Sequence, residues 1–143
     1  MKTTVFQGII DAIASDATIL GYLGGTYVFR GKADGLAHVP SITVRETTES
    51  SLKRVCYNAF PVRDNDVAVQ VDVWVSAAGE SFPYTGEHID QIAERVDELL
   101  VGATPVSGTR AWQKVGSSQQ YEDDTSIWHN ALRYTFQYSI TDT

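Results

Sequence analysis

The stretch VAVQVDVWVS, residues 67–76, places valine at every second position. Such alternation is typical of a β-strand that buries one face, because successive side chains of a strand point to opposite sides. The valines therefore predict a core-facing row. Gln70, Asp72 and Trp74 are predicted on the opposite face. There Trp74 either belongs to a protein contact surface, where tryptophan is enriched, or is covered by the segment 49–60.

Two apolar patterns of helical period predict helices on either side of this strand. The first runs from about residue 4 to residue 15, and a short helical turn capped by Asp16 follows it and ends at Gly24-Gly25. The second is an amphipathic helix from Ile89 to Leu100, closed by Gly102.

The remaining strands and loops complete the predicted architecture. Strands are predicted at residues 26–30, 41–46 and 110–115, and a long last strand carries an apolar row from Leu132 to Ile140. Residues 31–40, 77–84 and 116–126 are predicted as loops, and residues 47–66 as a long arm or an irregular hairpin. This order predicts one α+β domain over residues 1–143, a mostly antiparallel sheet of four to five strands with two main helices packed on one face.

Composition limits the classes of binding partner. The chain has 143 residues, enough to bury a core, and a formal net charge of −7. This charge argues against nucleic acid as a principal partner, because phosphate neutralisation needs clustered lysine and arginine, and against an anionic membrane surface. Gln7, Asp11 and Asp16 interrupt the N-terminal apolar run, so neither a signal peptide nor a membrane span is predicted.

Residues that carry chemistry are few and scattered. His38, His88 and His129 do not stand at metal-binding spacings, and we expect His129 in a loop or at a rim before the last strand. Cys56 is the single cysteine and has no motif that would orient it as a nucleophile. The sequence also lacks a phosphate-binding glycine loop and a nucleophile elbow. We therefore expect no enzyme, no catalytic residue, no cofactor and no metal site.

Five stretches stand in a characteristic order along the chain. They are LGYLGGTYVF at 20–29 behind the opening helix, PSITV at 40–44, VQVDVWV at 69–75, the helix 89–100, and ALRYTF at 131–136 behind an acidic loop. In this order they resemble the tail terminator and tail completion proteins of long-tailed bacteriophages. The resemblance covers nearly the whole chain and rests on element order and alternation.

The resemblance implies an antiparallel sheet with helices on one side and a structural role without catalysis or cofactor. Proteins of that family form a ring, commonly hexameric, that caps the finished tail tube and meets the head connector, while DNA passes through the lumen. The implied partners are further copies of the chain, the tail tube protein and the head–tail connector proteins. The implied location is the tail or neck of the virion, after assembly in the host cytoplasm.

Two stretches of opposite charge fit a ring, whose interface joins different patches of neighbouring subunits. The arm carries Lys53, Arg54 and Arg63, and the loop before the last strand carries the run Glu122-Asp123-Asp124. That run lacks the spaced oxygen ligands of a calcium loop. We hypothesise that the two stretches meet across the subunit boundary or face a neighbouring ring. With Asp72 and Trp74 they form the predicted interface.

Two other classes of function remain open at this point. One is a small bacterial ligand-binding or regulatory α+β domain, which a stable monomer with a deep apolar pocket would favour. The other is a hydrolase, which a pocket joining His129 or His88 to Cys56 or Asp72 would favour.

Overall fold

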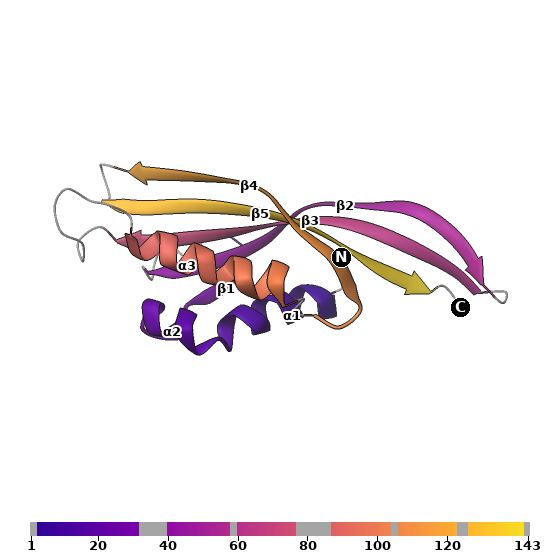
Figure 1. Cartoon of the computed structure of the whole chain (residues 1–143), viewed down its shortest axis with the longest axis horizontal. Helices are drawn as coiled ribbons and strands as arrows, with labels where there is room; N and C mark the ends of the chain where they lie inside the picture. Colours follow the sequence, from indigo (N-terminus) through magenta and orange to yellow (C-terminus); the bar gives the residue numbers. More distant parts are fainter. Residues whose placement is uncertain are drawn as a thin grey trace.

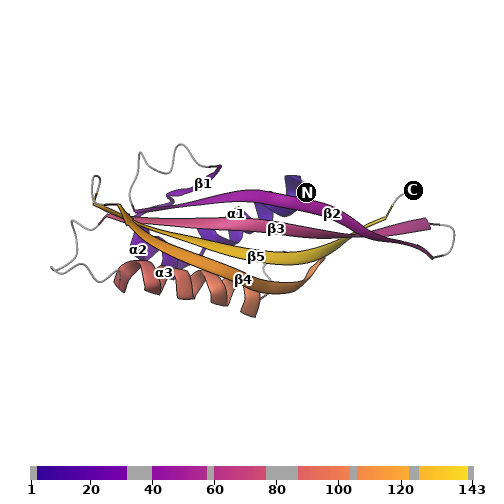
Figure 2. The same cartoon turned by 90° about the horizontal axis from the view of Figure 1, so that it is seen from above.

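The computed structural model describes residues 3–31, 40–57, 60–76, 87–103, 106–122 and 126–141, with the backbone alone for residues 3, 48–65, 87 and 139–141. Its elements are α1 (Thr3–Ala14), α2 (Ala17–Leu23), β1 (Val28–Arg30), β2 (Ser41–Tyr57), β3 (Phe60–Ser76), α3 (Glu87–Asp97), the π-helix η3 (Glu98–Gly102), β4 (Thr109–Glu122) and β5 (Ile127–Thr141). The strands form one sheet in the order β1-β2-β3-β5-β4. All of α1, α2 and α3 lie on one face of it, and none of the described elements lies on the other (Figures 1 and 2).

The valine row of β3 forms the centre of the core, as its alternation predicts. Val67, Val69, Val71 and Val73 are at most 1% exposed. They pack with α1, α3 and the apolar row of β5, whose Tyr134 and Phe136 are completely buried. At about 25 cal/mol per Å² of apolar surface, such burial is the main term that holds the helices to the sheet.

Sheet topology confirms the predicted α+β class and adds one parallel pair. The β2–β3, β3–β5 and β4–β5 pairs are antiparallel. In contrast, β1 runs parallel to β2, with Val28 opposite Ile42 and Arg30 opposite Val44. The sheet is therefore mixed, with β1 covering only the first residues of β2.

The arm predicted at residues 47–66 is the distal part of the β2–β3 hairpin. Pairing continues to Tyr57 opposite Phe60, and β5 follows β3 as far as Val62 opposite Thr141. Figure 1 shows that this end of the sheet extends past the helices. The molecule is therefore long in the strand direction, with a helix-covered half and a half built from strands alone.

The short helix α2 has the ends that its sequence predicts. The carboxylate of Asp16 accepts a hydrogen bond from the Ile19 amide at 3.1 Å, and Gly24 closes the helix in the left-handed region with φ of 76°. Both are ordinary devices for satisfying or redirecting the free backbone groups at helix ends.

Two sequence predictions near the C-terminus are wrong. Residues 116–122, predicted as part of a loop, continue β4, with Gly116 opposite Arg133 and Glu122 opposite Ile127. His129, predicted before the last strand, lies within β5. The pairing with β5 explains both differences, because it satisfies backbone hydrogen bonds along an edge strand whose polar side chains stay exposed. Asp123 and Asp124, the tip of the predicted acidic loop, lie outside the described residues.

Candidate interaction surfaces

The sheet face opposite the helices carries an aromatic pair. Trp74 of β3 and His129 of β5 are cross-strand partners, and their rings stack at 3.8 Å between centroids with an interplanar angle of 2°. The indole Nε1 of Trp74 donates a hydrogen bond to Thr43 Oγ1 on β2 at 3.2 Å. Trp74 thus lies on the predicted face but is half-buried and held by both neighbouring strands.

Asp72 lies beside this pair and is buried, although its position on the outer face predicts contact with solvent. Its Oδ1 lies 2.9 Å from His129 Nε2 and accepts a hydrogen bond from Gln70 Nε2 at 2.7 Å, while Arg45 Nε lies 3.7 Å from Oδ2. Residues of three strands therefore surround the carboxylate. A buried charge with such partners is a structural anchor, since leaving it unpaired would be costly.

The Asp72–His129 contact is a histidine–carboxylate pair of the kind that a hydrolase uses. Neither residue lines the cavity beside Val75 and His88 or the one beside Thr18 and Arg95. Trp74 stacks on the ring of His129, and the nearby hydroxyl of Thr43 already accepts a hydrogen bond from Trp74. The described contacts of the pair orient side chains on the outer sheet face.

The oppositely charged stretches lie at opposite ends of the sheet. Lys53 and Arg54 belong to β2 and Arg63 to β3, all in the distal hairpin, where Arg54 is opposite Arg63. Glu122 ends β4 at the other end of the sheet, opposite Ile127, which pairs in turn with Ser76. The strand register therefore keeps the two stretches apart within one subunit.

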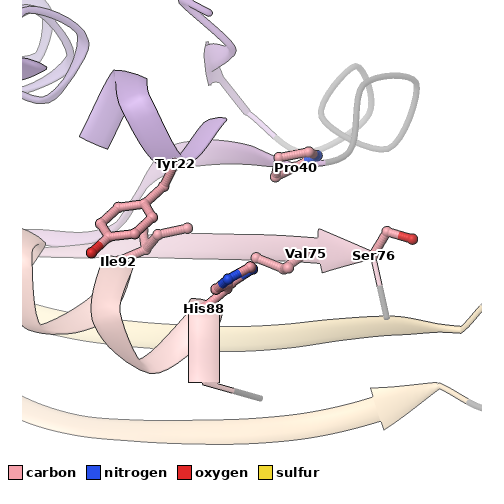
Figure 3. A pocket seen from close by; sticks show the side chains of 6 residues that line it. All are labelled: Tyr22, Pro40, Val75, Ser76, His88 and Ile92. Atoms are coloured by element: carbon pink, nitrogen blue, oxygen red, sulfur yellow. The ribbon is translucent and has the colours of Figure 1, made fainter. Parts of the chain in front are cut away.

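A small cavity of 260 Å³ opens between α2, α3 and the end of β3 (Figure 3). Its lining is Tyr22, Pro40, Val75, Ser76, His88 and Ile92. This volume is below the roughly 300–1,000 Å³ of typical small-molecule sites. His88 is exposed, and its ring lies 6.5 Å from that of Tyr22, so the histidine belongs to the cavity rim.

Two polar contacts tie α3 to its neighbours. Arg95 donates to both carboxylate oxygens of Asp16, at 3.0 and 2.7 Å, and this guanidinium lowers the pKa of Asp16. Tyr134 donates a short hydrogen bond to Asp97, which also pairs with Lys114 of β4 at 2.9 Å. Burial, reinforced by Asp97, raises the pKa of Tyr134. The first contact joins α3 to the start of α2, and the second fixes α3 against the sheet.

Sequence reasoning missed the partners of Asp72. Arg45, Gln70 and His129 come from three separate strands, and only the strand register brings them together. The alternation around Val71 already placed Gln70 and Asp72 on one face, so that part of the cluster was available from the sequence. Among the described residues there is no group of three or more potential metal ligands, and none of the described helices is long and apolar enough to cross a membrane.

A family model described as tail completion protein gp17 matches residues 7–139. The chain belongs to this tail completion protein family. The resemblance predicted from the sequence is thereby confirmed, and the family match makes the chain a structural protein of the virion tail. The sheet face around Trp74, the two ends of the sheet with their charged residues, and the edge strands are therefore surfaces of a tail protein.

A solved structure supports the fold of this tail completion protein. A chain from the virion of a native gene transfer agent particle superimposes with a TM-score of 0.60 at 18% sequence identity, over 97% of the present chain and 100% of the other. At this identity the likeness concerns the fold. No curated protein matches the sequence.

Proposed function

We propose that this tail completion protein forms a ring, with six copies as the expected number, that caps the tail tube and joins it to the head connector without catalysing a reaction. Family membership supports the tail role. The observation behind the joining role is that Lys53, Arg54 and Arg63 lie at the hairpin end, among Glu49, Asp64 and Asp66, whereas Glu122 lies at the other end of the sheet. Each end is then available to a different neighbour along the tail axis.

The length of the sheet argues against a contact between the two charged stretches within one subunit. Lys53 and Arg54 pair with Asp64 and Arg63 of β3, and Glu122 is level with Ser76, so the two stretches lie about 40 Å apart at roughly 3.3 Å per residue. Charges at that distance do not interact across water, because screening acts over about 8–10 Å at physiological ionic strength. We therefore propose that the basic stretch of one copy meets the acidic stretch of another copy, either across the subunit boundary or in a neighbouring ring.

Charge reversal tests this proposal. Lys53→Glu with Arg54→Glu should weaken joining of rings or of tail to connector, measured as the sedimenting fraction of assembled particles. Exposed pairs contribute about 0.2–1 kcal/mol each, so two pairs together should change the apparent affinity roughly 2- to 30-fold. Adding lysine at Glu122, Asp123 and Asp124 should restore joining. Unchanged assembly in both variants would contradict the proposal.

The acidic composition also suits a conduit for DNA. A duplex binds tightly where lysine and arginine neutralise its phosphates, and the chain carries a net charge of −7. A lumen built from such subunits would let DNA pass without retaining it. Lumen-lining residues that proved to be mostly lysine and arginine would refute this part of the proposal.

The ligand-binding alternative finds less support. The cavity between α2 and α3 is small and lies at the surface beside exposed Tyr22 and His88. The phenol of Tyr22 and the imidazole of His88 lie at the rim of this cavity and do not converge on a buried ligand position.

A further inference from the structure

The outer edge of β4 has two halves. Register shifts interrupt the first half and protect it from pairing, whereas the second half, the regular edge, pairs continuously with β5. Between Arg110 and Gly116 the ladder with β5 is interrupted twice by register shifts, and Ala111 has a positive φ of 56°. From Gly116 to Glu122 the pairing with β5 is continuous, and residues 117–120, Ser-Ser-Gln-Gln, are exposed and uncharged. Edge strands normally carry bulges, charges or proline against unwanted pairing, and this half has none of them before Glu122.

The opposite side of the sheet has a second free edge. β1 pairs with β2 only from Ile42 to Val44. From Arg45 onward, none of the described strands pairs with the outer side of β2, whose ladder with β3 shifts register between Glu46 and Thr48 and between Ser51 and Lys53. Figure 2 shows β2 and β4 as the two long outer strands of the sheet. One subunit therefore offers two different strand edges, one on each side.

We propose that the regular edge of β4 adds to the free edge of β2 in a second copy of the chain, so that the sheets continue from subunit to subunit. This inference rests on the proposed ring. Strand directions favour it: β2–β3, β3–β5 and β5–β4 are each antiparallel, so β4 runs opposite to β2. A rotated copy placed beside β2 thus presents β4 in the antiparallel sense, through a heterologous interface of the kind that closes into rings.

β1 sets the register of this contact. Because it occupies β2 up to Val44, the incoming segment Gly116–Glu122 must shift toward the hairpin end until Glu122 lies opposite Arg45. Gly116 is level with Arg45 in the sheet, so the shift is six residues, or roughly 20 Å. Closed sheets need such a stagger: strands tilted by 35–45° are offset by about four to six residues over four strands. The pairing of Glu122 with Arg45 would also bring side chains of opposite charge together.

Two adjacent proline variants test the edge contact. Making both variants removes the need to know in advance which of the two amides points away from β5. Consecutive amides of a strand point to opposite sides, so one of Ser117→Pro and Ser118→Pro removes a donor to β5 and the other removes only an outward donor. The outward variant should keep the wild-type melting temperature and lose ring formation on purified tail tubes at least tenfold. The inward variant should melt at a lower temperature.

Cysteine pairing tests the partner and the register in the full chain with Cys56→Ser. A mixture of the single variants Arg45→Cys and Glu122→Cys should form disulfide dimers on tail tubes, because the two positions would come within disulfide distance. Either variant alone should not. Gln119→Cys alone should also stay unlinked, whereas its dimerisation would indicate β4–β4 pairing and overturn the inference.

The outcomes separate this inference from the proposed function. If the wild-type chain forms no ring on tail tubes, the proposed function fails. If the wild type forms rings while both folded proline variants also do, or the mixed cysteines stay unlinked, the ring stands and the β4–β2 contact is refuted. Loss of rings in the stable proline variant together with the mixed disulfide establishes the contact.

Discussion

Replacing Tyr134 by phenylalanine isolates one hydrogen bond between the sheet and the helix layer. The ring is completely buried and keeps its packing, so Tyr134→Phe removes only the hydroxyl and its bond to Asp97. A hydrogen bond to a charged group contributes about 1.5–3 kcal/mol. Asp97 keeps Lys114 at 2.9 Å and is 32% exposed, so water replaces part of the lost bond. We expect a loss of about 1–2 kcal/mol, which lowers the melting temperature by roughly 3–7 °C.

Alkaline pH supplies a second measurement on the same variant. Burial first, and then Asp97, raise the pKa of Tyr134 above the value of about 10 expected in the unfolded chain. The folded state holds this proton more tightly, so its contribution to stability is complete below pH 10 and is lost as the pH rises toward the folded pKa. The loss is at most about 1.4 kcal/mol per pH unit. Tyr134→Phe has no such proton, so its stability should fall less steeply above pH 10.

Urea unfolding followed by tryptophan fluorescence between pH 7 and pH 11 measures both effects. Tyr22→Phe is the matched control, because Tyr22 is 38% exposed on α2. The control should follow the wild type at every pH. If Tyr134→Phe has the wild-type midpoint at pH 7 and a parallel pH dependence, the role assigned to the Tyr134–Asp97 bond is refuted.

Two further changes probe the helix ends. Asp16→Ala removes both the cap of α2 and the hydrogen bonds from Arg95, which together should cost about 1–3 kcal/mol at pH 7. Because Arg95 lowers the pKa of Asp16, the wild-type advantage should shrink as the pH falls through that depressed pKa. A difference that persists unchanged at pH 2 in urea unfolding would contradict this account. Gly24→Ala should destabilise by about 1 kcal/mol because Gly24 has φ of 76°, whereas Gly21→Ala, in open space within α2, should stabilise by up to about 1 kcal/mol. Urea midpoints that move in the same direction would count against the backbone explanation.

The parts of the fold that follow from local patterns were predictable. The valine row of β3 and the cap at Asp16 need only side-chain period and helix-end chemistry, and both predictions hold. The extension of β4 from Gly116 to Glu122 was not predictable in this way. Its side chains are polar and exposed on an edge strand, so no apolar alternation marks it, and only pairing with β5 makes it a strand.

In the candidate surfaces, too, the features set by local pattern were predictable and those set by strand pairing were not. Alternation put Asp72 and Trp74 on the face away from the helices, and the structure places them there, opposite to the valines of the core. Their contacts with His129 and Arg45 depend on the relative shift of three strands, which no single stretch of sequence encodes. The interface role of Asp72 and Trp74 remains a prediction.

The central position of β3 has a consequence for the order in which the chain folds. β3 pairs with β5 from Ser76 opposite Ile127 to Val62 opposite Thr141, so its partners lie about 50 to 80 residues further along the chain, and such non-local contacts slow folding. During synthesis the β2–β3 hairpin is made long before β5 leaves the ribosome. The valine row therefore lacks the cover of α3 and β5 until they are made, and exposed apolar surface of this kind promotes aggregation in folding chains.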